Sequence, residues 1–197
     1  RQTLRNPAMS LVDFPGRDRF VALIDAAVAN PCPESVTKAL RNALCAMIQD
    51  RDIELPAEVF DCCGDHYARR ELYRSDKHDY AVIAMTWGPG QGTAIHDHAG
   101  LWCVEGVWRG ALEITQYEPR DRDGDRVRFE NCGTIVAGRG SAGSLIPPHE
   151  YHTIRNASDQ ELAVSVHIYA KPMTCCSMFQ PADNGWFVRS ERILSLD

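Results

Sequence analysis

The feature that most constrains the fold of this chain is a change in hydrophobic period near residue 60. Before that point, apolar residues recur at helical spacing. One stripe contains Phe20, Leu23, Ile24, Ala27 and Val28, and a second contains Val36, Leu40, Leu44 and Met47. The segment Asn30-Pro31-Cys32-Pro33 separates them, and proline interrupts helical hydrogen bonding. We therefore expect helices within residues 1–60, with both stripes facing the core.

From about residue 66, short runs rich in Val, Ile, Tyr, Trp and Thr alternate with Gly, Pro, Asp and Asn. Regularly spaced strands of this kind predict an antiparallel barrel or a double-sheet jelly roll. The expected strands are 80–87, 101–107, 111–117, 126–130, 133–137, 143–146, 153–156 and 162–169. The aspartates of 121–125 superficially resemble a calcium loop, but the terminal Glu and flanking helices are absent, so we expect a hairpin turn there.

The composition favours one globular domain. With 197 residues the chain is long enough for a full core, and we expect a helical cover at 1–60, a barrel at 66–180 and a C-terminal tail at 181–197. A formal net charge of -6 provides no basic surface for nucleic acid or for an anionic membrane. The sequence thus predicts neither a nucleic-acid nor a membrane partner.

The eight cysteines do not form a disulfide or zinc pattern. Cys62-Cys63 and Cys175-Cys176 are vicinal pairs, which bridge poorly, and no C-x-x-C pair is present. Reduced thiols in a cytoplasmic protein are the expected state.

Histidines at i and i+2 indicate a metal site. On an extended strand, His96 and His98 point to the same face. His152 is a third candidate, and Ser165, His167 and Tyr169 again share one face of a strand. Neutral imidazole suits iron, zinc, copper or nickel and is a poor ligand for calcium or magnesium. The pattern therefore predicts a transition-metal site.

These motifs resemble the cupin superfamily, whose double-stranded β-helix, a jelly-roll barrel, binds metal inside. The first cupin motif is matched by Gly90, His96, His98 and Gly110, with Cys103 at its Glu position. The second is matched by Pro147, His152 and Asn156, with His149 where a Gly is expected. This register selects His152 as the third ligand, and a swap with His149 is the alternative.

Loss of the motif Glu, together with the Ser-x-His-x-Tyr sequence, resembles a thiol dioxygenase of the cysteine dioxygenase type I family, over about residues 56 to 180. The resemblance implies one Fe(II) per chain, bound by His96, His98 and His152, with no organic cofactor. It also implies that O2 and a small thiol, L-cysteine first, are the partners and that a sulfinic acid is the product.

The same resemblance assigns further residues. Cys103 occupies the position of a cysteine that forms a thioether bond to the active-site tyrosine, here Tyr169, although a small uncrosslinked residue is the alternative. His167 would orient the Tyr169 phenol, and Ser165 would fix the imidazole tautomer. Tyr67 and Arg69 match a Tyr-x-Arg motif whose arginine holds the substrate carboxylate. Ungapped counting back from Trp87 would instead select Arg70.

Other functions remain open on the sequence alone. A different cupin metalloenzyme, such as an isomerase or a quercetinase-like dioxygenase, is one alternative. Glu105 would then serve as the Glu of the first cupin motif, if the motif register slips by two residues. A non-catalytic cupin would sense a small ligand without the Ser-His-Tyr relay. Among thiol dioxygenases, 3-mercaptopropionate, mercaptosuccinate or another mercapto-acid is the alternative substrate. Relatives that act on 3-mercaptopropionate tend to carry Gln at the Arg69 position, so Arg69 and Cys103 favour cysteine.

Overall fold

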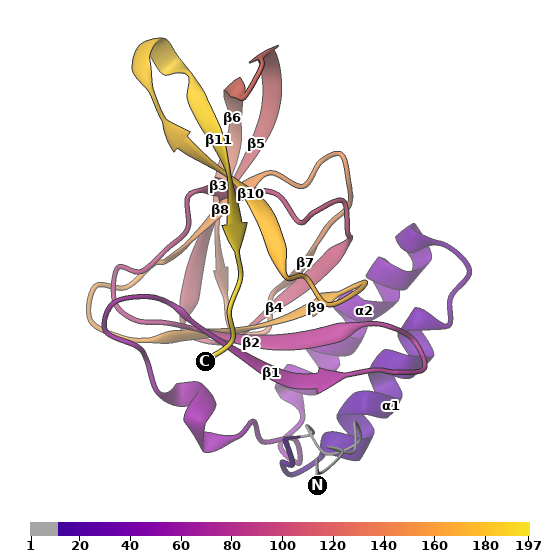
Figure 1. Ribbon diagram of the computed structural model, residues 1–197. Coiled ribbons are helices and arrows are strands. Elements are labelled where there is room, and N and C mark those ends of the chain that lie inside the picture. The colour runs from indigo at the N-terminus through magenta and orange to yellow at the C-terminus, as the bar shows by residue number, and fades with distance from the viewer. Residues whose placement is uncertain (1–11) are drawn as a thin grey trace, which may run out of the picture.

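The computed structural model describes residues 12–197 and shows two helices packed on one side of a β-barrel (Figure 1). Helix α1 spans Arg17–Val28 and helix α2 spans Pro33–Gln49, followed by the short 3-10 helix η2, Ala57–Phe60. Proline at the start of α2 suits a first helical turn, where its missing N–H is not needed. The predicted stripes are confirmed, because their buried members include Phe20, Ile24, Leu40 and Leu44.

The sheet next to the helices has five strands in the order β1-β2-β9-β4-β7, all paired antiparallel. Their bounds are β1 Ala68–Arg74, β2 Ala81–Trp87, β9 Ala163–Tyr169, β4 Cys103–Arg109 and β7 Ala142–Leu145. Helix α2 packs against β4 and β7. The helices therefore cover the outer face of this sheet.

The second sheet closes on itself in the order β10-β11-β6-β5-β8-β3, because β3 pairs with β10. Its strands are β3 Ile95–His96, β5 Ala111–Asp123, β6 Arg126–Gly138, β8 His152–Asn156, β10 Cys175–Pro181 and β11 Phe187–Ile193. The turn between β5 and β6 contains Gly124, whose φ of 59° is a left-handed conformation that favours glycine. The charged segment 121–125 is thus a hairpin tip, as predicted.

Strand β9 shows how the fold positions chemistry inside the barrel. All seven of its residues are buried. Val164, Val166 and Ile168 belong to the core under the helices. Because side chains alternate along a strand, Ser165, His167 and Tyr169 point the other way, into the barrel. Packing of the apolar face of β9 under the helices thus directs the polar face of the same strand into the barrel.

The predicted fold class is confirmed: the protein is mainly β, a jelly-roll barrel with N-terminal helices. Two expected strands, 126–130 and 133–137, are one strand, β6, which pairs with β5 through register shifts. The segment expected as a C-terminal tail contains β11, which pairs with β10 from Cys175↔Ile193 to Pro181↔Phe187. Within residues 12–197, no helix is long and apolar enough to span a membrane.

Candidate active site

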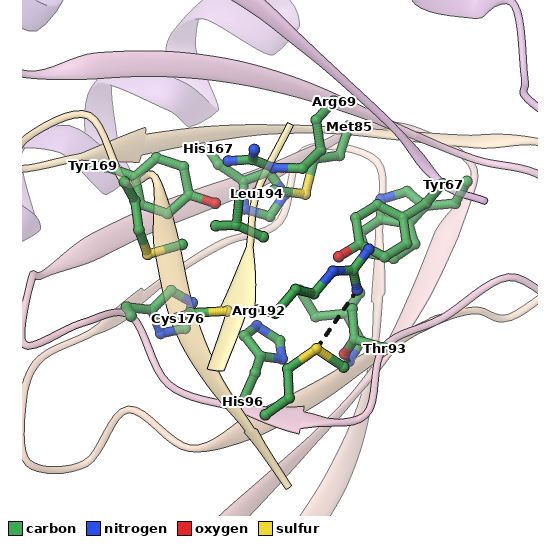
Figure 2. A pocket seen from close by; sticks show the side chains of 15 residues that line it. Tyr67, Arg69, Met85, Thr93, His96, His167, Tyr169, Cys176, Arg192 and Leu194 are labelled. Atoms are coloured by element: carbon green, nitrogen blue, oxygen red, sulfur yellow. Dashed lines mark hydrogen bonds between the residues drawn. The ribbon is translucent and has the colours of Figure 1, made fainter. Parts of the chain in front are cut away.

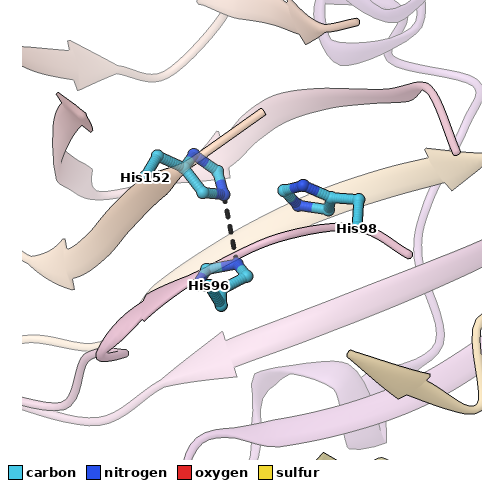
Figure 3. Close-up of side chains that lie close together, drawn as sticks. All are labelled: His96, His98 and His152. Atoms are coloured by element: carbon cyan, nitrogen blue, oxygen red, sulfur yellow. Dashed lines mark hydrogen bonds between the residues drawn. The ribbon is translucent and has the colours of Figure 1, made fainter. Parts of the chain in front are cut away.

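Three imidazoles converge inside the barrel. His96 on β3 lies opposite His152 on β8 in the strand register, and His98 follows two residues after His96. The Nε2 atoms of His96 and His152 are 3.1 Å apart, and the candidate ligand atoms of all three residues lie within 4.8 Å of one another (Figure 3). Sequence spacing predicted the first pair, and strand pairing between β3 and β8 brings in the third residue.

The groups that face Nδ1 of two rings indicate which nitrogens are free for a metal. Nδ1 of His96 lies 3.0 Å from the carbonyl oxygen of Ala94, which can only accept, so Nδ1 carries the proton. Nδ1 of His152 points toward Glu105 Oε1 at 3.8 Å. The Nε2 lone pairs of both rings therefore face each other, an arrangement that a cation between them stabilises. Two nitrogens bound at right angles to one metal at about 2.1 Å are about 3 Å apart, so the observed spacing fits a shared metal.

The electrostatics of the site keep these imidazoles neutral. Burial lowers the pKa of His96. Burial and the neighbouring imidazoles hold the pKa values of His98 and His152 well below the usual value for histidine. Neutral imidazole is the form that binds a metal, and three nitrogen ligands suit iron, zinc, copper or nickel. The residues present therefore fit a transition metal of the kind the sequence predicts.

The alternative third ligand, His149, lies outside this cluster. Its side chain is 70% exposed, and its Nδ1 contacts Glu118 Oε1 at 2.8 Å. It follows a turn in which its backbone N–H donates to Ile146, so the ring points to solvent rather than into the barrel. The structure thus places His152, and not His149, beside His96 and His98.

Glu105 on β4 stands behind the histidines rather than among them. One carboxylate oxygen, Oε2, lies 3.2 Å from Nδ1 of His167, although not at a hydrogen-bonding angle. The other lies 3.8 Å from Nδ1 of His152, on the far side of that ring from its Nε2. The register slip that would make Glu105 a ligand is not observed. Its carboxylate instead faces two buried imidazoles.

The Ser-His-Tyr face of β9 is assembled only in part as expected. Ser165 Oγ lies 2.7 Å from Nε2 of His167 and accepts a 2.9 Å hydrogen bond from Trp87 Nε1. Since Trp87 can only donate, the Ser165 hydroxyl is free to donate to the imidazole. The rings of His167 and Tyr169 stack with centroids 6.2 Å apart, and no hydrogen bond joins them in the described structure. The two nitrogens of His167 face Ser165 and Glu105 instead.

Cys103 and Tyr169 are direct cross-strand partners on β4 and β9. Both are buried, and burial raises the pKa of the thiol and of the phenol well above their usual values. Both groups are therefore protonated at neutral pH. This pairing places sulfur and phenol on one inner face, next to His98, whose ring centroid is 6.3 Å from that of Tyr169.

A small cavity opens onto His96 and His98 (Figure 2). Arg69 on β1 lines it and is only 5% exposed, and its Nη1 donates to the Ser195 carbonyl at 3.2 Å. Arg70 faces away and donates to Thr86 Oγ1 and to the Asp61 carbonyl. Tyr67 also lines the cavity and stacks on Trp87 at 4.6 Å. Of the two candidate arginines, only Arg69 reaches the histidines' cavity.

Comparison with known proteins decides the family. The model of the family "Cysteine dioxygenase type I" matches residues 59–182, more than half of the chain. The chain belongs to this family. "Cysteine dioxygenase type 1" of Danio rerio is 29% identical over 119 residues, 56% of this chain and 54% of the relative. "Cysteine dioxygenase type 1" of Homo sapiens is 28% identical over 128 residues, which are 57% of this chain and 59% of the relative.

The matches to these two members of the cysteine dioxygenase type I family thus span between half and two thirds of their length. Among solved structures, the protein TT1209 from Thermus thermophilus is similar with a TM-score of 0.46 and 18% identity, covering 61% of this chain and 98% of that one.

Sequence reasoning did not find every residue at the site of this cysteine dioxygenase family member. Arg192 on β11 lines the cavity, although its segment was expected to be a tail. Glu150 is buried, and its Oε2 accepts the backbone N–H of His98 at 2.9 Å, which holds the loop after β3. The β-prone residues 186–189 are a signal for β11. Nothing in the sequence shows which of its side chains enters the barrel.

Proposed function

We propose that this protein is a non-haem Fe(II) thiol dioxygenase that oxidises a small carboxylated thiol, such as cysteine, to its sulfinic acid. The observation that carries this proposal is the set of three neutral imidazoles, two of which, His96 and His98, line a cavity that also holds a buried arginine. Membership of the cysteine dioxygenase type I family supports the reaction class. The eight free cysteines agree with a reducing compartment such as the cytoplasm.

The proposed reaction balances without an organic cofactor. A thiol and one O2 give a sulfinic acid: both oxygen atoms become bonded to sulfur, and the thiol hydrogen ends on the acid. Sulfur loses four electrons and O2 gains them, so no external reductant is needed. Bound Fe(II), held by His96, His98 and His152, would favour the thiolate as a Lewis acid and activate O2.

The protein side chains would position the substrate. Arg69 presents a planar fork that binds a carboxylate in bidentate fashion, with its direction fixed by the Ser195 carbonyl. Met85, Ile154 and Leu194 give the cavity an apolar wall that excludes water. The protonated Tyr169 phenol can donate a hydrogen bond to substrate at the open side of the histidines.

The test is oxygen uptake by the Fe(II)-loaded protein with cysteine, 3-mercaptopropionate and cysteamine, with sulfinic acid identified by mass spectrometry. Carboxylated thiols should be oxidised much faster than cysteamine. His152→Ala should abolish uptake and bound iron, whereas the control His149→Ala should retain both. If the protein binds stoichiometric iron but oxidises no thiol, it is a non-catalytic metal-binding cupin and the proposal is wrong.

Arg69 has its own matched control. Removing one member of a desolvated charge pair costs about 2–5 kcal/mol, which is about 30- to several-thousand-fold in rate. Arg69→Ala should lower kcat/KM for cysteine by a factor in this range. The ratio of kcat/KM for cysteine to that for cysteamine should therefore decrease. Arg70→Ala removes the neighbouring guanidinium from the opposite face and should leave the ratio of kcat/KM for cysteine to that for cysteamine nearly unchanged.

A further inference from the structure

The cavity above the histidines carries two positive charges and no matching negative one. Among the described residues, its lining includes Arg69 and Arg192 but no aspartate or glutamate. No carboxylate of residues 12–197 lies within 4.0 Å of either guanidinium. An arginine cannot lose its proton to relieve this situation. Two guanidinium groups therefore face one small cavity without a partner anion.

Arg192 is placed in the cavity by the pairing of β11 with β10, where it lies opposite Cys176. Its guanidinium carbon lies 5.5 Å from the centre of the Tyr67 ring, and Nη1 is 3.7 Å from the Met178 sulfur (Figure 2). These contacts orient the side chain but do not neutralise it. Arg189, on the same strand, is exposed and donates to Ser177 instead.

Both arginines line the same cavity and act on the same two groups. Burial and the Asp97 carboxylate raise the pKa of the Cys176 thiol to about 11, and Arg192 and Arg69 both oppose this rise. Burial also raises the pKa of Tyr67, again opposed by the two arginines. Figure 2 shows the two side chains entering the cavity from different strands. Each planar fork is thus available to a separate carboxylate.

We propose that this cavity selects thiols that carry two carboxylates, with Arg69 receiving one and Arg192 the other. The inference rests on the proposed dioxygenase function and names its substrate class. A dicarboxylated thiol balances both guanidinium charges, whereas a monocarboxylated thiol leaves one of them without a partner anion. Cysteine adds an ammonium group when protonated, for which the lining offers no carboxylate. Arg192 is then the specificity-determining residue.

The kinetic test uses mercaptosuccinate and 3-mercaptopropionate, which differ by one carboxylate, with the iron-loaded protein. The parent should show a kcat/KM for mercaptosuccinate that is higher by about 30-fold or more, as expected for one desolvated charge pair. Arg192→Met should remove most of this preference while retaining turnover of 3-mercaptopropionate. Arg192→Lys, which keeps the charge without the fork, should keep part of the preference, and the control Arg189→Met should keep all of it.

Equal efficiency of the parent with both thiols would overturn the inference while leaving the dioxygenase function intact. An equal loss with both thiols in Arg192→Met would also overturn it, because Arg192 would then serve a carboxylate that both share. Binding measured by calorimetry separates the inference from the function. If no thiol is oxidised but succinate binds more tightly than propionate, and only when Arg192 is present, the two-carboxylate site stands and the proposed function fails.

Discussion

The cross-strand pair Cys103 and Tyr169 leads to a prediction about a single covalent bond. Their opposed positions on β4 and β9 make a thioether between sulfur and the phenol ring geometrically natural. Its formation replaces one S–H and one ring C–H bond by an S–C bond, and O2 takes up the two electrons and two protons. After turnover with thiol and O2, we expect a protein fraction lighter by two hydrogens and a peptide that joins Cys103 to Tyr169.

The controls for this bond are two single substitutions. Cys103→Ser should show only the full mass. Cys176→Ser removes a different cysteine, one that lines the cavity, and should retain the lighter species. A preparation with repeated turnover that contains only full-mass protein would show that Cys103 is an uncrosslinked small residue.

Glu105 leads to a second prediction at the residue scale. A carboxylate behind a metal-binding imidazole fixes the orientation of the ring, and its loss typically weakens metal binding about 10- to 100-fold. Glu105→Gln keeps the shape but removes the charge that faces His152 and His167. We expect weaker Fe(II) binding in anaerobic competition with a chelator. Glu118→Gln, which alters only the exposed pair with His149, should bind iron like the parent.

The residues of the site differ in how far their positions could be predicted from the neighbouring sequence. His96 and His98 were predictable because both lie within three residues of one another on an extended segment. His152 required a motif register, since it joins them only through the pairing of β8 with β3. Arg192 and the placement of Glu105 were not predictable, because each depends on which face of its strand the barrel encloses.

At the scale of elements, the contact between α2 and β4 gives a stability prediction. Leu44 is fully buried, and an added Cβ at Gly106 of β4 would lie 3.4 Å from its Cβ, so helix and strand are in close contact. Leu44→Ala should lower the free energy of unfolding by about 2–5 kcal/mol. Denaturant unfolding with an unchanged m-value measures this.

The control for this contact is Lys38→Ala, an exposed change on the same helix that should shift stability by about 0.5 kcal/mol or less. Bound iron should be the same in both variants, since Leu44 lies under the outer face of the sheet. Equal stability of the two variants would show that the helix contributes little to the fold.

Element prediction succeeded where burial leaves a pattern. Strand β9 has seven buried residues and was found within one residue of its start. Strand β11 was missed because four of its seven residues are not apolar, most of the strand is exposed, and its apolar residues do not alternate. Its place is set by hydrogen bonding to β10 and by two residues of β6. Backbone pairing of this kind has no local signature.

At the scale of the whole molecule, the barrel and its helices share one core. The buried hydrophobic core extends from Phe20 and Leu44 in the helices to Val104 and Val166 in the sheet. The opposite face of this sheet lines the barrel. We propose that the chain folds as a single domain. Side chains such as those of β9 connect the helical core to the metal site, so iron binding should stabilise both parts together.

Removal of iron tests this coupling. A ligand at 100 times its Kd stabilises the native state by about 2.7 kcal/mol. For a protein of this size, that corresponds to a rise in Tm of about 5–11 °C. Anaerobic melts followed by far-ultraviolet circular dichroism and by tryptophan fluorescence should give one shared transition that moves by this amount when Fe(II) is added. In His98→Ala the shift should disappear, because one of the three ligands is lost. If iron moves only the fluorescence transition, the barrel and the helices unfold separately and the single-domain proposal is wrong.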